Sequence, residues 1–267
     1  MVQNATRWPL FPRFMVLDMR EKTARKIPAP LPGSGRKAQP ARSIASAPVV
    51  LAGAQTTLTE DAYRRLEEMI VTLELAPGSV VSEAILSERI GIGTTPIREA
   101  LQRLSREYLI QILPRRGVIV TGIDVRQQLQ VLETRRELDR LIARAAARRG
   151  QADDRARFAD IARTMQRAVA AGDTHAFLRA DGELNGALAS AARNEIASRT
   201  VATLHSVSRR FWYFHRNDHR GGAANTMRLH VEFARALAGG KEDAVSRACD
   251  ALIDDLVDFA RSTVGAA

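Results

Sequence analysis

Apolar residues recur every three or four positions along much of the chain, a spacing typical of amphipathic helices. Three such stripes lie between residues 60 and 106, with apolar positions Leu66, Met69, Ile70 and Leu73, then Ile85, Leu86 and Ile90, then Ile97, Ala100, Leu101 and Leu104. Pro77 and Gly78 end the first predicted helix, and Ser82 is placed to cap the second. The pattern therefore predicts three helices in this part of the chain.

A short turn separates the second helix from the third. Gly91 and Gly93 permit backbone angles that other residues resist, so the chain can stop one helix and start the next within a few residues. Thr95 is the expected N-cap of the third helix, with Pro96 in its first position. Two helices joined in this way are typical of a helix-turn-helix.

Two runs rich in β-branched residues follow, at residues 108–113 and 118–121. They flank residues 114–117, a Pro-Arg-Arg-Gly segment, and so predict a hairpin with a basic tip. Three helices and a basic hairpin predict a winged helix-turn-helix.

The pattern from residue 124 onward is helical, with breaks near Gly150, Gly172, Asn194, Gly221 and Gly239. It predicts six helices, whose apolar positions include Leu129, Leu132, Leu141 and Ile142; Phe158, Ile161, Met165 and Val169; Phe177, Leu184 and Leu188; Leu204, Val207, Phe211 and Phe214; Met227, Phe233 and Leu237; and Leu252, Leu256 and Phe259. Helices with one apolar stripe and short connections pack as an antiparallel bundle. We therefore predict a mainly α fold, a winged helix followed by an all-α antiparallel bundle.

Charge and composition divide the chain further. The net charge of +10 is concentrated in residues 1–55, which are rich in proline and basic residues and show no sustained period. We expect residues 1–55 to be a disordered basic arm, which either adds nonspecific DNA affinity or is an inert extension. Residues 56–123 are the expected DNA-binding domain, and residues 124–267 the expected effector-binding and dimerization domain.

The sequence lacks a secretory signal pattern and a stretch long enough to span a membrane. Cys249 is the single cysteine, which excludes an internal disulfide and favours a reducing cytoplasm. We expect Cys249 to be a small buried hydrophobe.

The candidate DNA contacts cluster on the third helix and the hairpin. A helix fits the major groove, and residues at its N-terminal end meet base edges. The expected DNA-binding residues are Thr94, Thr95, Arg98, Gln102, Arg103, Arg115, Arg116 and Gly117. Arg98 can pair with guanine, whereas the hairpin arginines suit the DNA backbone or minor groove. The alternative is that these arginines only solvate the surface.

These residues also carry a family resemblance. Residues 60–123 resemble the winged-helix domain of GntR transcription regulators through the following motifs: Leu75-Ala-Pro-Gly78, Ser82-Glu83, Gly91, Thr95-Pro-Ile-Arg-Glu-Ala-Leu101 and Arg115-Arg-Gly117. Ala84 and Thr94 depart from the pattern, because many members have arginines there that touch the operator. The resemblance implies binding to double-stranded operator DNA.

Two polar residues fall on apolar stripes of the bundle. Asp181 lies among apolar positions of the third bundle helix, and His230 lies on the fifth. A carboxylate in such a place requires a cation, a metal or a hydrogen-bond donor. Arg135 or Arg136 could supply a structural salt bridge, or the group could form a ligand pocket.

The pocket interpretation gains from a resemblance to the FCD (FadR-like) subfamily of GntR regulators, whose landmarks match Glu133-Thr-Arg135, Leu138-Asp139, residues 177–181 and His230. The resemblance implies a small carboxylate effector, with Arg135, Asp181, Asn185 and His230 as the expected effector-binding residues. In many members one Asp and three His hold a divalent metal such as Zn, Ni or Mn. Here Asp181, Asn185 and His230 are the candidate metal ligands, with Asn185 and Leu252 in place of two histidines.

The function predicted from these features is that of a homodimeric transcription regulator, a repressor and not an enzyme, whose operator affinity changes when an organic acid binds the bundle. Two alternatives remain. One is a metal-dependent enzyme that uses Asp181, Asn185 and His230, and the other is a DNA-binding dimer without an effector.

Overall fold

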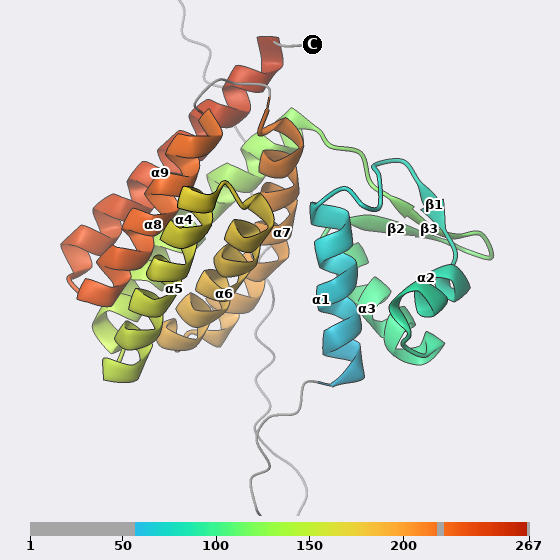
Figure 1. Ribbon diagram of the computed structural model, residues 1–267, viewed down its shortest axis with the longest axis horizontal. Helices are drawn as coiled ribbons and strands as arrows, with labels where there is room; N and C mark the ends of the chain where they lie inside the picture. The colour runs from blue at the N-terminus through green and yellow to red at the C-terminus, as the bar shows by residue number, and fades with distance from the viewer. Residues whose placement is uncertain (1–56, 218–221, 266–267) are drawn as a thin grey trace, which may run out of the picture. The chain divides into compact units, whose positions relative to one another are not determined.

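The N-terminal part of the described chain is a winged helix-turn-helix (Figure 1). The computed structural model describes residues 57–217 and 222–265, so the expected basic arm at residues 1–55 lies outside it. The elements of the winged helix are, in order, α1 (Leu58–Val71), β1 (Val80–Val81), α2 (Glu83–Ile90), α3 (Thr94–Arg106), β2 (Ile110–Leu113) and β3 (Gly117–Val120).

The apolar stripes expected for α1 and α3 face a common core. The buried members are Leu66, Met69 and Ile70 on α1, and Ile97, Ala100, Leu101 and Leu104 on α3. These two helices pack directly against each other. On α2 the expectation was only partly right, because Leu86 and Ile90 are buried but Ile85 is 56% exposed.

The N-cap of α2 agrees with the prediction from the sequence, whereas that of α3 differs from it. Ser82 caps α2 as predicted, because its hydroxyl accepts a hydrogen bond from the backbone N–H of Ile85 at 3.2 Å. The predicted cap at Thr95 is wrong: α3 begins at Thr94, with Gly93 as its N-cap and no side-chain hydrogen bond. Thr94 and Thr95 therefore lie within the first turn of α3, where their side chains remain exposed.

The hairpin belongs to a three-stranded antiparallel sheet in the order β1-β3-β2. In the β2–β3 hairpin Leu113 pairs with Gly117, and on the other side of β3 Val80 of β1 pairs with Ile119. The sequence did not indicate β1, because two residues are too few to show a period of two.

Gly117 has a structural role in this sheet. Its φ of +98° is unfavourable for other residues, and a Cβ there would lie 2.5 Å from the backbone oxygen of Val81. We expect Gly117→Ala to lower the free energy of unfolding by about 2 kcal/mol, because β1 or the hairpin has to shift. Urea denaturation checks this value. Gly122→Ala is the matched control, since a Cβ at Gly122 meets nothing within 4 Å; equal losses in both variants would contradict the prediction.

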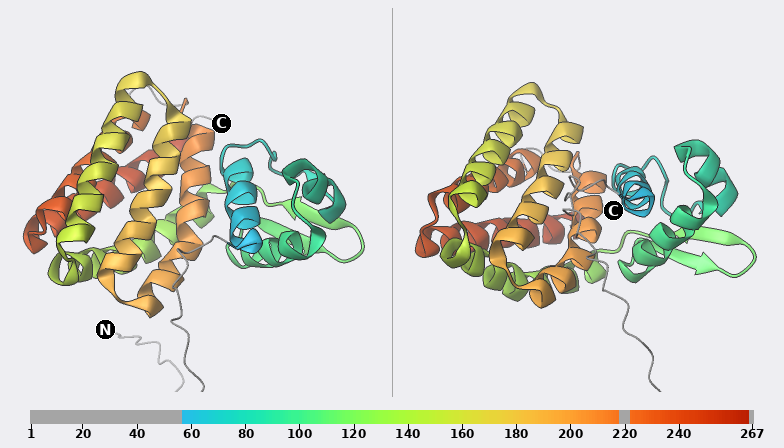
Figure 2. Two further views of the ribbon diagram at one scale, coloured as in Figure 1. Left: turned by 60° about the horizontal axis from the view of Figure 1, so that its bottom comes forward. Right: turned by 90° about the horizontal axis from the view of Figure 1, so that it is seen from below.

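The C-terminal part is a bundle of helices, as predicted (Figure 2). Its described helices are α4 (Val125–Arg149), α5 (Ala152–Ala171), α6 (Thr174–Ala192), α7 (Glu195–His215), α8 (Gly222–Gly239) and α9 (Glu242–Ser262), followed by the short 3-10 helix η1 (Thr263–Gly265). Helix α4 packs against α6, α7 and α9, and α5 packs against α6 and α8. This arrangement gives the bundle its own apolar core.

Most of the apolar positions predicted for the bundle are buried or partly buried, with two exceptions. Leu141 on α4 is 45% exposed and Phe214 on α7 is 46% exposed. Cys249 of α9 is buried, as expected, and burial raises the pKa of its thiol to about 12. None of the described helices is long and apolar enough to cross a membrane.

Candidate DNA-binding face and ligand pocket

The first turn of α3 presents an exposed polar surface. Thr94, Thr95 and Arg98 are all exposed there. Nη2 of Arg98 donates a hydrogen bond to Oε2 of Glu83 at 2.8 Å, while the Arg98 side chain stays 62% exposed. Glu83 thus restrains Arg98 at the surface without burying it. An exposed guanidinium in this place can reach a DNA base or phosphate.

Two further candidates on α3 differ in their surroundings. Gln102 is exposed, whereas the Arg103 guanidinium binds Glu60 of α1 at 3.0 Å and Glu107 at 3.1 Å, and lies 3.4 Å from the centroid of the Tyr63 ring. These contacts hold α3 against α1. A DNA contact by Arg103 would therefore come in addition to a structural role.

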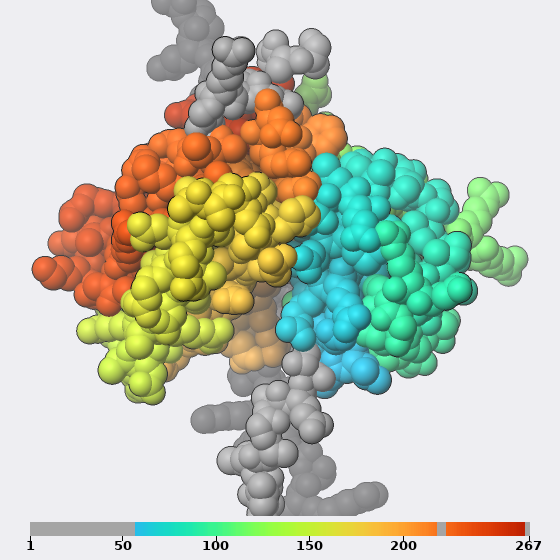
Figure 3. Space-filling view, viewed as in Figure 1, coloured from blue at the N-terminus to red at the C-terminus, as the bar shows by residue number. Residues whose placement is uncertain are grey.

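The tip of the hairpin carries the last group of candidates. Arg115 and Arg116 are exposed, and the light green tip of the hairpin projects from the surface of the winged helix (Figure 3). Arg115 has a positive φ of 64°, and the N–H of Arg116 donates to the oxygen of Leu113 at 3.0 Å. This tight turn directs two cations outward next to Gly117.

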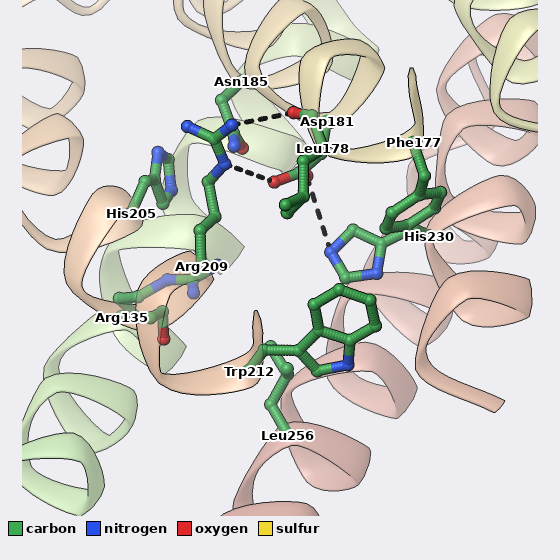
Figure 4. A pocket seen from close by; sticks show the side chains of 11 residues that line it. Arg135, Phe177, Leu178, Asp181, Asn185, His205, Arg209, Trp212, His230 and Leu256 are labelled. Carbon is green, nitrogen blue, oxygen red and sulfur yellow. Dashed lines mark hydrogen bonds and ion pairs between the residues drawn. The ribbon is translucent and has the colours of Figure 1, made fainter. Parts of the chain in front are cut away.

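The polar residues expected in the bundle line one pocket (Figure 4). All four effector-binding candidates, Arg135, Asp181, Asn185 and His230, are among its lining residues. Apolar walls come from other positions on α6, α7 and α9, namely Phe177, Leu178, Trp212 and Leu256. The pocket thus combines apolar surface with a few converging polar groups, which is typical of small-molecule sites.

Asp181 is the central polar residue of the pocket, and its side chain is 6% exposed. Its Oδ2 lies 3.2 Å from Nε of Arg209 on α7, and its Oδ1 lies 3.5 Å from Nε2 of His230 on α8. The expected ion pair of Asp181 with Arg135 or Arg136 is therefore wrong. The cation beside Asp181 comes from α7.

Arg135 and Arg136 instead have partners of their own. Nε of Arg135 donates to Oδ2 of Asp139 at 2.9 Å, and the same carboxylate contacts His205 of α7 at 3.0 Å through its Oδ1. Burial alone would raise the pKa of Asp139, but the charges and hydrogen bonds of Arg135 and His205 hold it below its usual value. Arg136 binds the exposed Asp254 of α9 at 2.6 Å.

The residues of this pocket do not fit a divalent metal. Such sites usually need three or more nitrogen, oxygen or sulfur ligands from the protein. Asp181 and His230 supply two, Asn185 could supply a weaker amide oxygen, and the buried Leu252 supplies none. Over residues 57–217 and 222–265, no cluster of three or more His, Cys, Asp or Glu side chains is placed to hold a metal ion. The Arg209 guanidinium already neutralises Asp181.

Sequence reasoning missed His205, Ser208 and Arg209 on α7 as pocket residues and left the role of Trp212 open. His205 and Arg209 gave no signal in the sequence, because neither belongs to the apolar stripe expected for α7. Trp212 stood in an aromatic run, Phe211-Trp-Tyr-Phe214, which indicated pocket, core or dimer interface without deciding among them. In the structure Trp212 lines the pocket, while Phe211 and Tyr213 are buried in the bundle.

A winged helix with an exposed polar first turn on α3, followed by a helical domain with a polar pocket, defines a DNA-binding regulator with a ligand-binding domain. Comparison with known families agrees with this class. Residues 58–120 match the family described as bacterial regulatory proteins of the gntR family, and residues 130–255 match the FCD domain. The chain belongs to the GntR family of transcription regulators and carries an FCD domain.

Named relatives are also regulators. The chain is 26% identical over 204 residues to the HTH-type transcriptional repressor RspR of Escherichia coli, a match that covers 76% of this chain and 89% of the relative. It is 43% identical over 68 residues to an uncharacterized HTH-type regulator of Streptomyces ambofaciens. That second match covers 26% of this chain and 29% of the relative, well under two thirds of its length.

Solved structures share the fold. The E. coli protein McbR/YncC aligns over 79% of this chain and 100% of its own, with a TM-score of 0.67 and 18% identity. A GntR regulator from Rhodococcus aligns over 78% of this chain and 98% of its own, with a TM-score of 0.58 and 19% identity. At these identities the likeness extends to the fold alone.

Proposed function

We propose that the chain is a repressor that acts as a homodimer and leaves its operator when a small organic acid binds the bundle. The exposed first turn of α3 carries this proposal, because Thr94, Thr95 and Arg98 form the leading edge of a helix that fits the major groove. Each subunit would bind one half of a near-palindromic operator, since twofold symmetric dimers match twofold symmetric DNA.

We assign a separate function to each part of the chain. We propose residues 1–55 as an arm, residues 56–123 as the DNA-binding domain, and residues 124–267 as the effector-binding and dimerization domain. The protein would work in the bacterial cytoplasm, where operator DNA lies. Gln102, Arg115 and Arg116 would add contacts along the DNA, and Gly117 would hold the wing in shape.

The effector site we propose contains Arg135, Asp181, Asn185 and His230. A small organic acid suits this site because guanidinium groups bind carboxylates through paired hydrogen bonds. The effector can change operator affinity only as far as it binds the released form of the protein more tightly than the DNA-binding form. The donor set disfavours a metal as part of this site.

A selection from randomised duplex DNA tests the DNA-binding function. The full-length protein should enrich a near-palindromic sequence at moderate salt. In footprinting, the bound protein should protect both half-sites of that duplex from cleavage. Failure to prefer any duplex at moderate or low salt would remove the proposal, because phosphate contacts alone give affinity without sequence preference.

Arg98→Ala tests the proposed base contact. We expect a loss of about 1–3 kcal/mol in binding to the selected operator and a much smaller loss on random DNA, because a bidentate contact to a base is specific. Fluorescence anisotropy with both duplexes measures the two affinities. Arg106→Ala, at the far end of α3, is the control and should weaken both by similar small amounts. Equal losses on both duplexes for Arg98→Ala would assign this residue to the DNA backbone.

Asp181→Ala tests the effector pocket. The substitution removes the common partner of Arg209 and His230, so the pocket loses its polar geometry. We expect the response of operator binding to organic acids to fall at least about tenfold while the protein still binds operator DNA. Anisotropy titrations with and without the acids measure the response. Asp160→Ala, an exposed change on α5, is the control, and an unchanged response in Asp181→Ala would take Asp181 out of the site.

A further inference from the structure

Arg209 of α7 contacts two other helices, α6 and α1, with one guanidinium group. Its Nε lies 3.2 Å from Asp181 Oδ2, its Nη2 donates to the backbone oxygen of Leu178 at 2.8 Å, and its Nη1 donates to Oε1 of Glu67 at 2.5 Å. Asp181 and Leu178 belong to α6 in the bundle, whereas Glu67 belongs to α1 of the winged helix. The side chain of Arg209 thus joins the pocket to the DNA-binding domain.

Arg209 also lies where the pocket meets a wider groove. Four residues line both cavities, namely Leu178, Asn185, His205 and Arg209. The groove is lined in addition by Glu67 and other residues of α1. A molecule that passes from the groove toward Asp181 therefore meets Arg209 at the boundary.

The pocket has unused donors that indicate the chemistry of its ligand. Two buried N–H groups in its lining, Nε of Arg209 and Nε1 of Trp212, have no hydrogen-bond partner among the described residues. The Arg209 Nε is close to Asp181 but poorly aligned with it, so the contact is an ion pair only. Buried donors without partners are costly, and an ionised carboxylate is a ligand that only accepts hydrogen bonds.

We propose that a small carboxylate binds in this pocket directly to Arg209, without a metal, and takes the guanidinium away from Glu67 of α1. Pocket occupancy and the Arg209–Glu67 contact then exclude each other. This inference rests on the proposed effector function and names the residue that recognises the effector and transmits its presence.

The competition follows from the surroundings of Glu67. Its side chain is only 12% exposed, and its Oε1 accepts hydrogen bonds from both Arg209 and the hydroxyl of Ser206 at 2.7 Å. If a ligand takes Arg209, a nearly buried carboxylate keeps one neutral donor, which is unfavourable. Water in the groove reaches only the small exposed part of Glu67, so full hydration of this carboxylate requires α1 to move away from α7. Ligand binding therefore loosens α1, the first helix of the DNA-binding domain.

A tryptophan reporter makes binding measurable without knowledge of the natural effector. The chain has two tryptophans, Trp8 and Trp212, and Trp212 lines the pocket. In a Trp8→Phe background, the full-length dimer is titrated with sodium acetate, lactate, succinate and citrate while Trp212 fluorescence is recorded. Each titration is repeated with EDTA, and circular dichroism melts check that every variant is folded.

Glu67→Gln is the decisive variant, and Glu68→Gln is its matched control. Glu68 is the next residue of α1 and also pairs with a bundle arginine, Arg179 at 3.5 Å, but that pair is half exposed and lies apart from the pocket. We expect Glu67→Gln to tighten carboxylate binding about 5- to 100-fold, because it weakens the competitor for Arg209, and Glu68→Gln to change it less than twofold. Arg209→Met should abolish binding, and EDTA should have no effect.

Reciprocity supplies a second readout. If the ligand acts by freeing α1, Glu67→Gln without ligand should shift operator affinity in the same direction as the carboxylate shifts it in the parent protein. An opposite shift overturns the inference. So does equal tightening by the two glutamine variants, or loss of binding in EDTA, which would assign the carboxylate to a metal.

The outcomes also separate this inference from the proposed function. Carboxylate binding that is unaffected by Glu67→Gln overturns the competition and leaves the effector function standing. Absence of binding by all four acids, to the parent and to Glu67→Gln alike, overturns the organic-acid function and the competition together.

Discussion

Replacement of Arg210 by methionine is expected to lower the free energy of unfolding by about 3 kcal/mol, the largest loss for a single side chain at the junction of the two domains. Arg210 follows Arg209 on α7 and is 1% exposed. Its guanidinium donates to the backbone oxygens of Thr121 and Gly122, each at 3.1 Å, and to the hydroxyl of Thr121 at 3.0 Å. Methionine fills a similar volume but donates no hydrogen bond.

The size of the effect follows from the lost donors. Within the described part of the chain, the partners of Arg210 are the backbone oxygens of Leu109, Thr121 and Gly122 and the Thr121 hydroxyl rather than carboxylates, so dipoles next to β2 and β3 balance its charge. Burial lowers the pKa of Arg210 to about 10, which still leaves it protonated at neutral pH. Without it, the carbonyls of Thr121 and Gly122 lose their part-buried hydrogen bonds to Arg210, and a buried group left unsatisfied costs about 1–3 kcal/mol.

Two controls make the Arg210 prediction specific. Arg199→Met changes the same residue type on the same helix, but Arg199 is 78% exposed, so urea denaturation should register less than about 0.5 kcal/mol. Arg210→Lys keeps the charge and should recover part of the loss. Limited proteolysis should cut Arg210→Met faster near residues 121–124. A denaturation midpoint equal to that of the parent protein would show that the carbonyl contacts add nothing.

The winged helix could be predicted from the sequence almost completely, because its signals are local. Stripe spacing placed the buried faces of α1 and α3, and a single hydroxyl at Ser82 identified the start of α2. The predicted start of α3 was too late in the chain, because Thr95 and Gly93 are both acceptable N-caps. The choice between them depends on the path of the preceding turn. Strand β1 was missed because its two residues show no period and its partner, β3, lies nearly forty residues away.

The pocket was only partly predictable, because its polar contacts join different helices. A polar residue on an apolar stripe correctly placed Asp181 and His230 in the interior. The cation beside Asp181 was sought on α4, because Arg209 does not belong to the single apolar stripe expected for α7. In the structure α7 packs against α1 as well as against α4 and α6. A helix covered on several sides buries polar positions that its own stripe cannot indicate.

Asp139→Asn is expected to cost about 3–5 kcal/mol at pH 7, the range found when one partner of a buried ion pair is removed. Asp139 binds Arg135 at 2.9 Å and His205 at 3.0 Å, and the three side chains are each less than 10% exposed. Asparagine preserves the shape but leaves the buried Arg135 without a counterion. Since Arg135 lines the pocket, the substitution should also weaken binding of carboxylates there.

The stability that Asp139 contributes should decrease as the pH falls. Despite burial, which acts to raise it, the pKa of Asp139 in the folded protein is lowered by Arg135 and His205. A carboxyl group with a lowered folded pKa contributes stability that is fully present above its unfolded value of about 3.9 and is lost as the pH falls through the folded value. The difference in unfolding free energy between the parent and Asp139→Asn should therefore be largest near neutral pH and shrink in acid below about pH 4.

Asp254→Asn separates a buried pair from an exposed one on the same stretch of α4. Asp254 binds Arg136, the neighbour of Arg135, but is 63% exposed. Its removal should cost less than about 1 kcal/mol, because water and salt screen an exposed pair. Urea denaturation of the three proteins from pH 7 to pH 3 measures both effects. If Asp139→Asn and Asp254→Asn are equally mild at pH 7, the buried carboxylate does not hold Arg135 in place, and the orientation of Arg135 toward the pocket requires another cause.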